Sequence, residues 1–128
     1  MQENLFGEPE APAMTKRQIT RAQKAARVPV AEVNKAFEYW RDMFWAGRGP
    51  RPKLSEARSR LIAAAIYDYG LESVKLAIKG CSLSDFHMGN NRAGRRYNDI
   101  ELILRDAEHI EKFIALTVED ESRGEGNF

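Results

Sequence analysis

Apolar residues recur in this chain at intervals of three and four positions, and no stretch alternates strictly between apolar and polar residues. Val30, Val33, Phe37, Trp40 and Phe44 show this spacing. Such intervals place side chains on one face of an α-helix, whereas a half-buried strand requires alternation. Clusters of β-branched residues, which favour strands, are also missing. The sequence therefore predicts a small all-α domain.

Helix-breaking residues divide this pattern into about five helices. A short basic helix over residues 16–27, capped by Thr15, should end at Val28-Pro29, because the residue before a proline avoids helical angles. A second helix is expected over residues 30–45. Its buried face is widened by Tyr39, Met43 and Trp45.

Ser55 and Gly70 mark the two ends of a third helix. Before it, residues 47–53 contain two glycines and two prolines and therefore form a basic loop. Ser55 is placed to cap the helix, and Gly70 favours the turn that ends it. A short fourth helix follows, in which Cys81 is a small buried residue rather than a reactive thiol. The expected core positions of both helices are Leu61, Ile62, Ala65, Ile66, Tyr69, Val74, Ala77, Ile78 and Cys81.

The helical spacing stops between residues 82 and 96. Turn residues, two glycines and three arginines in this stretch predict an exposed loop, anchored by Phe86 and Met88. The last helix, or helix pair, should break at Arg105-Asp106, where Asp106 is placed to cap a new start. Its expected inner face consists of Ile100, Ile103, Leu104, Ala107, Ile110, Phe113 and Ile114.

Length and composition suit a single domain. The chain has 128 residues, of which 43% are hydrophobic and 30% charged, enough for one core of roughly 100 residues. We expect a helical domain over residues 15–119 between disordered tails over residues 1–14 and 120–128, which lack apolar periodicity. No run approaches the ~18 apolar residues of a membrane span, and no signal peptide is evident. A cytoplasmic location is therefore expected.

The net charge of +1 conceals a strong asymmetry along the chain. Residues 16–96 contain 17 lysines and arginines against seven carboxylates, whereas residues 97–128 contain three against nine. A basic body with an acidic end favours a polyanionic partner such as nucleic acid. An acidic protein would also match this surface.

Two clusters of basic residues are the candidate phosphate contacts. Such contacts supply affinity without reading sequence, so DNA binding is expected to be sequence-nonspecific. Phe37, Trp40 and Phe44 have core spacing, which leaves Tyr97 and Trp45 freer to stack on bases. The candidate nucleic-acid contacts are Arg51, Lys53, Arg58, Arg60, Lys79, Arg92, Arg95 and Arg96.

The sequence offers little support for catalysis. Asp85 and His87 resemble an acid-base pair, but a loop aspartate beside a histidine more often makes local hydrogen bonds. Carboxylates over residues 99–106 lie at a helix start, where they complement the helix dipole without a metal. One cysteine and two distant histidines exclude a zinc finger and an internal disulfide. We expect a protein that is not an enzyme and has no cofactor and no metal.

A helix-turn-helix interpretation centres on residues 26–33, whose small and branched residues suit such a turn. However, Arg27 replaces the usual turn glycine. The helix that would read DNA also carries Glu32, Glu38 and Asp42, which would repel the DNA backbone. A small helix-turn-helix transcription regulator is kept as an alternative.

Two longer segments resemble a known family. They are KLAIKGCSLSDFHMG at residues 75–89 and RYNDIELILRD at residues 96–106. With the aromatic stretch FEYW at residues 37–40, they look like the conserved C-terminal domain of phage and prophage replication proteins, of the replisome-organiser or helicase-loader type. The resemblance covers residues 36–116. It implies a role in phage DNA replication beside DNA, a helicase, or both.

The stretch QENLF at residues 2–6 resembles the peptide by which bacterial replication proteins bind the sliding clamp, matching its Gln, Leu and Phe. A disordered tail of this kind docks apolar anchors in a groove. The exposed loop offers further apolar contacts. The candidate partner-binding residues are Gln2, Leu5, Phe6, Phe86, His87 and Met88.

Three functions remain open at this point. The first is a non-catalytic phage-type DNA replication accessory protein that binds DNA through a basic surface and contacts a helicase, its loader or the sliding clamp. The second is a phage-encoded interaction module that modulates a host machine. The third is the transcription regulator.

Replacing both Leu5 and Phe6 with alanine should abolish binding to a sliding clamp, because these are the two apolar anchors of the segment. Wild-type binding is expected to be on the order of micromolar, since ordering a tail offsets much of the contact energy. Calorimetry with purified clamp measures both. Deleting residues 1–13 should leave the helical domain folded. If the double variant binds the sliding clamp as well as the wild type does, residues 2–6 are not a clamp-binding peptide.

Overall fold

The computed structural model describes residues 19–125, with side chains up to residue 122, and this part of the chain consists of helices and loops. The expected all-α class is confirmed. The tail expected over residues 1–14 lies outside the described residues. The described helices are α3 (Arg21–Ala25), α4 (Val30–Trp45), α5 (Glu56–Tyr69), α6 (Leu71–Ser82), α7 (Ile100–Ile103) and α8 (Ala107–Glu125).

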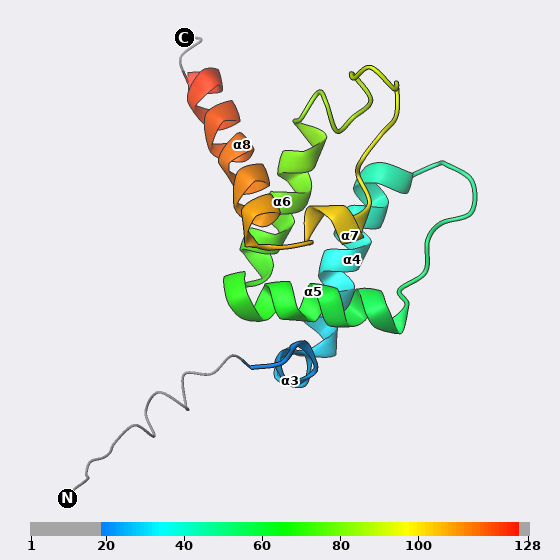
Figure 1. The fold of residues 1–128 in the computed structure, drawn as a ribbon, viewed down its shortest axis with the longest axis vertical. Helices are drawn as coiled ribbons and strands as arrows, with labels where there is room; N and C mark the ends of the chain where they lie inside the picture. Colours follow the sequence, from blue (N-terminus) through cyan, green and yellow to red (C-terminus); the bar gives the residue numbers. More distant parts are fainter. Residues whose placement is uncertain (1–18, 126–128) are drawn as a thin grey trace, which may run out of the picture.

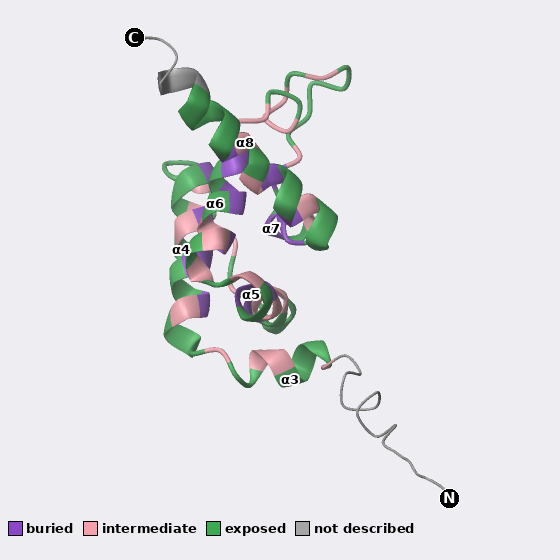
Figure 2. Ribbon diagram, turned by 90° about the vertical axis from the view of Figure 1, so that its left-hand side faces the viewer, coloured by how far each residue is buried: buried purple, intermediate pink, exposed green. Residues whose placement is uncertain are grey.

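The helices form a bundle in which α6 and α8 lie side by side and share the most extensive helix contact. In the view of Figure 1, α5 runs below α6 and α7 and crosses the lower part of α4, and α3 packs against α5. Two loops leave the bundle as separate projections (Figures 1 and 2). We call residues 46–55, between α4 and α5, the linker loop, and residues 83–99, between α6 and α7, the arginine loop.

The core lies where the inner faces of α4, α5, α6, α7 and α8 meet (Figure 2). Removing apolar surface from water stabilises such a core by about 25 cal/mol per Å². Cys81 is fully buried within it, and burial raises the pKa of its thiol to about 12. The thiol is thus a packing group. The largest fully buried side chains are Trp40, Phe113, Ile62, Ile78, Ile100 and Ile103.

Three of the expected helix ends are confirmed by their hydrogen bonds. The Ser55 hydroxyl accepts the backbone N–H of Arg58 at 3.2 Å and so caps α5. Gly70 ends α5 with a φ of 90°, which favours glycine. Asp106 accepts the backbone N–H of His109 at 2.9 Å, so α8 starts anew after α7, as the sequence predicts.

The first expected helix begins later than predicted. Thr20 has an extended backbone and caps α3, whose first residue is Arg21, so a continuous helix over residues 16–27 is wrong. The Thr20 hydroxyl accepts the Gln23 N–H at 3.1 Å, while the Gln23 side chain accepts the Thr20 N–H at 2.8 Å. Thr15 and Thr20 both have a glutamine three residues later, Gln18 and Gln23, so the capping-box pattern alone does not distinguish the two threonines. The break before Pro29 is confirmed.

Some residues expected on buried faces are exposed. Val30 is 74% exposed, because α3 packs against α5 and leaves the first turn of α4 uncovered. Met43 and Ala107 also face solvent. Of the other expected positions of α4, Val33, Phe37, Trp40 and Phe44 are buried, whereas Tyr39 and Trp45 are half-buried. At the far end, α8 continues to Glu125, beyond the boundary at residue 119 where the helical domain was expected to end.

Gly80 allows the close approach of α6 and α8. A Cβ atom at this position would overlap the carbonyl oxygen of Phe113 and lie 2.5 Å from its carbonyl carbon. These are backbone atoms of a fully buried residue, so they cannot move aside as a flexible side chain would. Glycine at position 80 therefore sets the distance between the two helices.

Gly80→Ala should destabilise the fold by about 1–3 kcal/mol or more, because the added methyl group pushes α6 away from α8. Helix propensity alone would give the opposite sign, since alanine is favoured over glycine by about 1 kcal/mol in a helix. Gly49→Ala is the control, because a Cβ there meets nothing within 4 Å. Urea denaturation compares the two variants. A Gly80→Ala protein as stable as the wild type would contradict the close approach.

Candidate functional site

The arginine loop is braced by the side chain of Asn91. Its Nδ2 donates to the carbonyl oxygens of Phe86 and Arg95, both at 2.7 Å, and its Oδ1 accepts the N–H of Arg95 at 3.2 Å. The two sides of the loop also pair directly, through an antiparallel bridge between Met88 and Arg96. The Tyr97 N–H donates to the His87 carbonyl at 2.8 Å. These hydrogen bonds join the two sides of the loop and hold it in one defined conformation.

His87 and Met88 attach the loop to the bundle. The His87 ring meets the ring of Phe113 edge-on, with centroids 4.8 Å apart, and its Nδ1 lies 2.7 Å from the Ser84 hydroxyl. Burial and the nearby Lys112 lower the pKa of His87, which favours the neutral imidazole. Met88 packs against the core. Of the two expected anchors, Met88 is thus confirmed, whereas Phe86 is replaced in that role by His87.

Phe86 instead faces solvent and is 53% exposed. Its ring stacks on Tyr97, with centroids 5.7 Å apart and an angle of 16° between the planes. Tyr97 is half-buried beneath it. Trp45, the other aromatic residue expected to be free, is also half-buried and lies 6.5 Å from Trp40. Phe86 is therefore more available for stacking than either residue that the sequence favoured.

The arginine loop has a net positive charge. Arg92, Arg95 and Arg96 are exposed, and none of them forms an ion pair within residues 19–122. Its two carboxylates are Asp85 and Asp99, so the three arginines leave residues 83–99 with a net charge of +1. Since all three guanidinium groups lie on one short, braced segment, they can approach the same polyanion together.

The basic residues beside the linker loop are mostly paired with carboxylates. Ion pairs join Arg51 to Asp42 at 2.6 Å, Arg58 to Glu101 at 2.7 Å and Arg60 to Glu56 at 3.4 Å. Each neighbouring carboxylate reduces the attraction of its arginine for phosphate, because the pair is nearly neutral at a distance. Lys53 and Lys79 have no such partner among the described residues. The arginine loop is thus the stronger of the two clusters.

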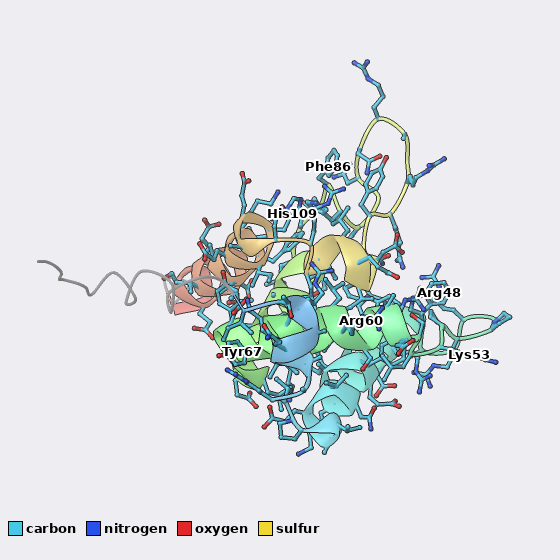
Figure 3. The ribbon with its side chains drawn as sticks, turned by 60° about the horizontal axis from the view of Figure 1, so that its bottom comes forward. Arg48, Lys53, Arg60, Tyr67, Phe86 and His109 are labelled. Atoms are coloured by element: carbon cyan, nitrogen blue, oxygen red, sulfur yellow. The ribbon has the colours of Figure 1, made fainter. Side chains whose placement is uncertain are left out.

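The two clusters do not merge into one surface. In Figure 3, Lys53 and Arg48 stand on the linker loop at one end of α5, and Phe86 stands apart from them on the arginine loop. The bases of the loops meet at Trp40 instead. Its indole N–H donates to the Asn98 carbonyl at 2.8 Å, and the Arg58 guanidinium lies 5.9 Å from the ring centroid.

A groove that the sequence did not suggest lies between α3, α5 and the start of α8. It has a volume of about 630 Å³. An ion pair between Lys24 and Asp68, with atoms 2.9 Å apart, borders it. Its apolar lining consists of Ile19, Leu61, Ala64, Ala65, Leu104, Ala107 and Ile110. Residues from three distant parts of the sequence form this groove, so no local pattern could have revealed it.

The residues considered for catalysis do not converge. The hydrogen-bond partner of the His87 ring is Ser84, not Asp85. His109 pairs with Asp106 at 2.7 Å, and its hydrogen bonds lower the pKa of that carboxyl. Within the described residues, no group of three or more histidine, cysteine or acidic side chains is arranged to hold a metal ion.

The geometry of α3 and α4 does not favour a helix-turn-helix. The first helix of such a motif would be α3, but α3 has only five residues and packs against α5. The second helix of the motif would be α4, which buries Trp40 and exposes the carboxylates Glu38 and Asp42.

Among residues 19–125, no helix has the length and apolarity needed to cross a membrane. The candidate partner residues Gln2, Leu5 and Phe6 lie outside the described residues.

Comparison of the chain with protein-family models, curated proteins and solved structures found no match.

Asn91→Ala should loosen the arginine loop without unfolding the bundle, because the lost hydrogen bonds are all local to the loop. We expect faster amide exchange at Arg95, and a loss of stability of about 1–2 kcal/mol. Asn90→Ala is the matched control, since the Asn90 side chain makes no hydrogen bond within the described residues. Hydrogen exchange measured by NMR decides the point. Equal protection of Arg95 in both variants would show that Asn91 does not brace the loop.

Proposed function

We propose that this protein is a non-catalytic DNA-binding accessory protein of phage-type replication, which holds DNA through the arginine loop. The observation that carries the proposal is the set of three exposed arginines, without carboxylate partners among the described residues, on a loop braced by Asn91. Guanidinium groups pair well with phosphate because their planar fork donates two parallel hydrogen bonds.

The bracing of the loop supports this proposal energetically. A flexible basic segment loses conformational freedom when it binds, and that loss offsets part of the contact energy. In the arginine loop the backbone of Arg95 is already held by Asn91, and that of Arg96 by the bridge to Met88. The arginine loop therefore loses less conformational freedom on binding DNA.

The replication setting rests on the family resemblance. The resembling segment at residues 75–89 contains α6 from its fifth residue onward and the first half of the arginine loop. The segment at residues 96–106 contains the end of that loop and α7. The features that resemble replication proteins thus lie in and around the proposed DNA contact. A helicase, its loader or a sliding clamp would be the protein partner.

The groove between α3, α5 and α8 favours a second candidate function, a protein-interaction module. Its apolar floor and charged rim suit a protein segment better than a phosphate backbone. A partner with an acidic surface would in addition match the basic residues of the chain. If this function holds, the protein should bind a purified acidic partner protein and should not bind DNA.

The DNA proposal is tested by removing two arginines from each cluster. Arg92→Ala with Arg95→Ala should weaken binding to labelled DNA and reduce the slope of log affinity against log salt by about 2, because about 0.9 counterions are released per phosphate contact. Arg51→Ala with Arg60→Ala removes the same charge from residues that are already paired, and should weaken binding less. Fluorescence anisotropy between roughly 50 and 200 mM salt measures both.

Two results would contradict the proposal. If the wild type does not bind DNA at roughly 50 mM salt, the basic loop serves another purpose. If both double variants weaken binding equally, affinity follows net charge and the arginine loop has no special role. Circular dichroism of each variant confirms that the fold is retained, as expected for exposed surface substitutions.

A further inference from the structure

Phe86 is an exposed aromatic ring held in a fixed position. Within residues 19–122, it is the one phenylalanine or tryptophan classed as exposed. One face of its ring is covered by Tyr97, and the His87 ring meets it edge-on with centroids 5.3 Å apart. The Phe86 side chain is nevertheless 53% exposed, so part of its ring stays open to solvent despite these two contacts. This open apolar surface is unusual on a loop that otherwise exposes mainly charged and polar residues.

The same loop ties this ring to the unpaired arginines. One nitrogen atom, Nδ2 of Asn91, donates to the carbonyl oxygens of both Phe86 and Arg95, so the backbones of the two residues are held next to each other. The bridge between Met88 and Arg96 fixes a second arginine on the same side of the bundle. The Phe86 ring and two arginines thus belong to one braced segment.

From this arrangement we infer that the arginine loop binds single-stranded DNA, with an unpaired base stacked on the open face of Phe86 and the flanking phosphates held by Arg95 and Arg96. The inference rests on the proposed DNA-binding function and names the form of DNA. Binding of single strands combines a basic groove with aromatic rings on which bases stack. Every base has a flat face, so this contact needs no particular sequence.

Duplex DNA fits the ring less well. The faces of its bases are stacked on one another inside the helix, and only their edges and the phosphates reach the surface. A duplex would therefore contact the arginines and leave the Phe86 face in water. The geometry accordingly predicts that Phe86 contributes to binding of a single strand and contributes little to binding of a duplex.

The experiment compares a labelled oligothymidylate with a labelled hairpin duplex, using full-length protein and fluorescence anisotropy. Phe86→Ala should weaken single-strand binding by about tenfold, within the range of about 5- to 150-fold that loss of a stacking aromatic produces. Duplex binding should change by less than about twofold, and the salt dependence should stay the same, because the phosphate contacts remain. Phe86→Trp keeps a flat ring and should restore single-strand binding.

Two further variants serve as controls. Phe86→Leu keeps apolar bulk without a flat ring, so single-strand binding should fall almost as far as in Phe86→Ala. Val118→Ala shortens an equally exposed apolar residue on α8, away from the arginine loop, and should change neither affinity. Thermal unfolding of each variant shows whether the bundle is intact.

Some outcomes would overturn the inference while sparing the proposed function. If Phe86→Ala binds the single strand as the wild type does, while removal of Arg92 and Arg95 weakens DNA binding, the protein binds DNA without stacking. Equal losses on single strand and duplex, or full binding by Phe86→Leu, would also overturn it. If the wild type binds neither DNA, the inference and the proposed function both fail.

Discussion

The indole of Trp40 connects the core of the bundle to the end of the arginine loop and to the start of α5. It is 1% exposed and packs on Phe37 in the core of α4, with ring centroids 5.6 Å apart. Its N–H donates to the Asn98 carbonyl at the end of the arginine loop, and Arg58, from the start of α5, lies over its ring. One buried side chain thus sets the position of both loops relative to the bundle. Losing it would leave the buried Asn98 carbonyl without its partner as well as a cavity.

The helices could be predicted from the sequence because their signals are local. The spacing of apolar residues located α4 at its observed bounds, and Ser55, Gly70 and Asp106 marked helix ends through contacts within a few residues. The role of Gly80 depends instead on Phe113, which comes 33 positions later and faces it from another helix. Nothing in the residues around position 80 indicates that contact.

The candidate site was predictable in location but not in detail. The loss of helical spacing, together with the glycines and arginines of this stretch, correctly predicted an exposed loop. Which of two neighbouring rings packs on the bundle depends on where Phe113 lies, so His87 anchors the loop in place of the expected Phe86. Arg58 forms an ion pair with Glu101, which lies 43 positions away in the sequence. Because such partners are distant, the sequence did not show which basic residues are paired with carboxylates and which are free to bind an anion.

The contact at Gly80 also limits how the sequence of this fold can diverge. Every other amino acid has a Cβ, so no side chain is tolerated there while α6 and α8 keep their present crossing. A distant relative with the same bundle must either keep glycine at this position or separate the two helices and refill the space between them. A glycine at this point of α6, facing the backbone of α8, is therefore a feature by which such relatives can be recognised when little else in their sequences is shared.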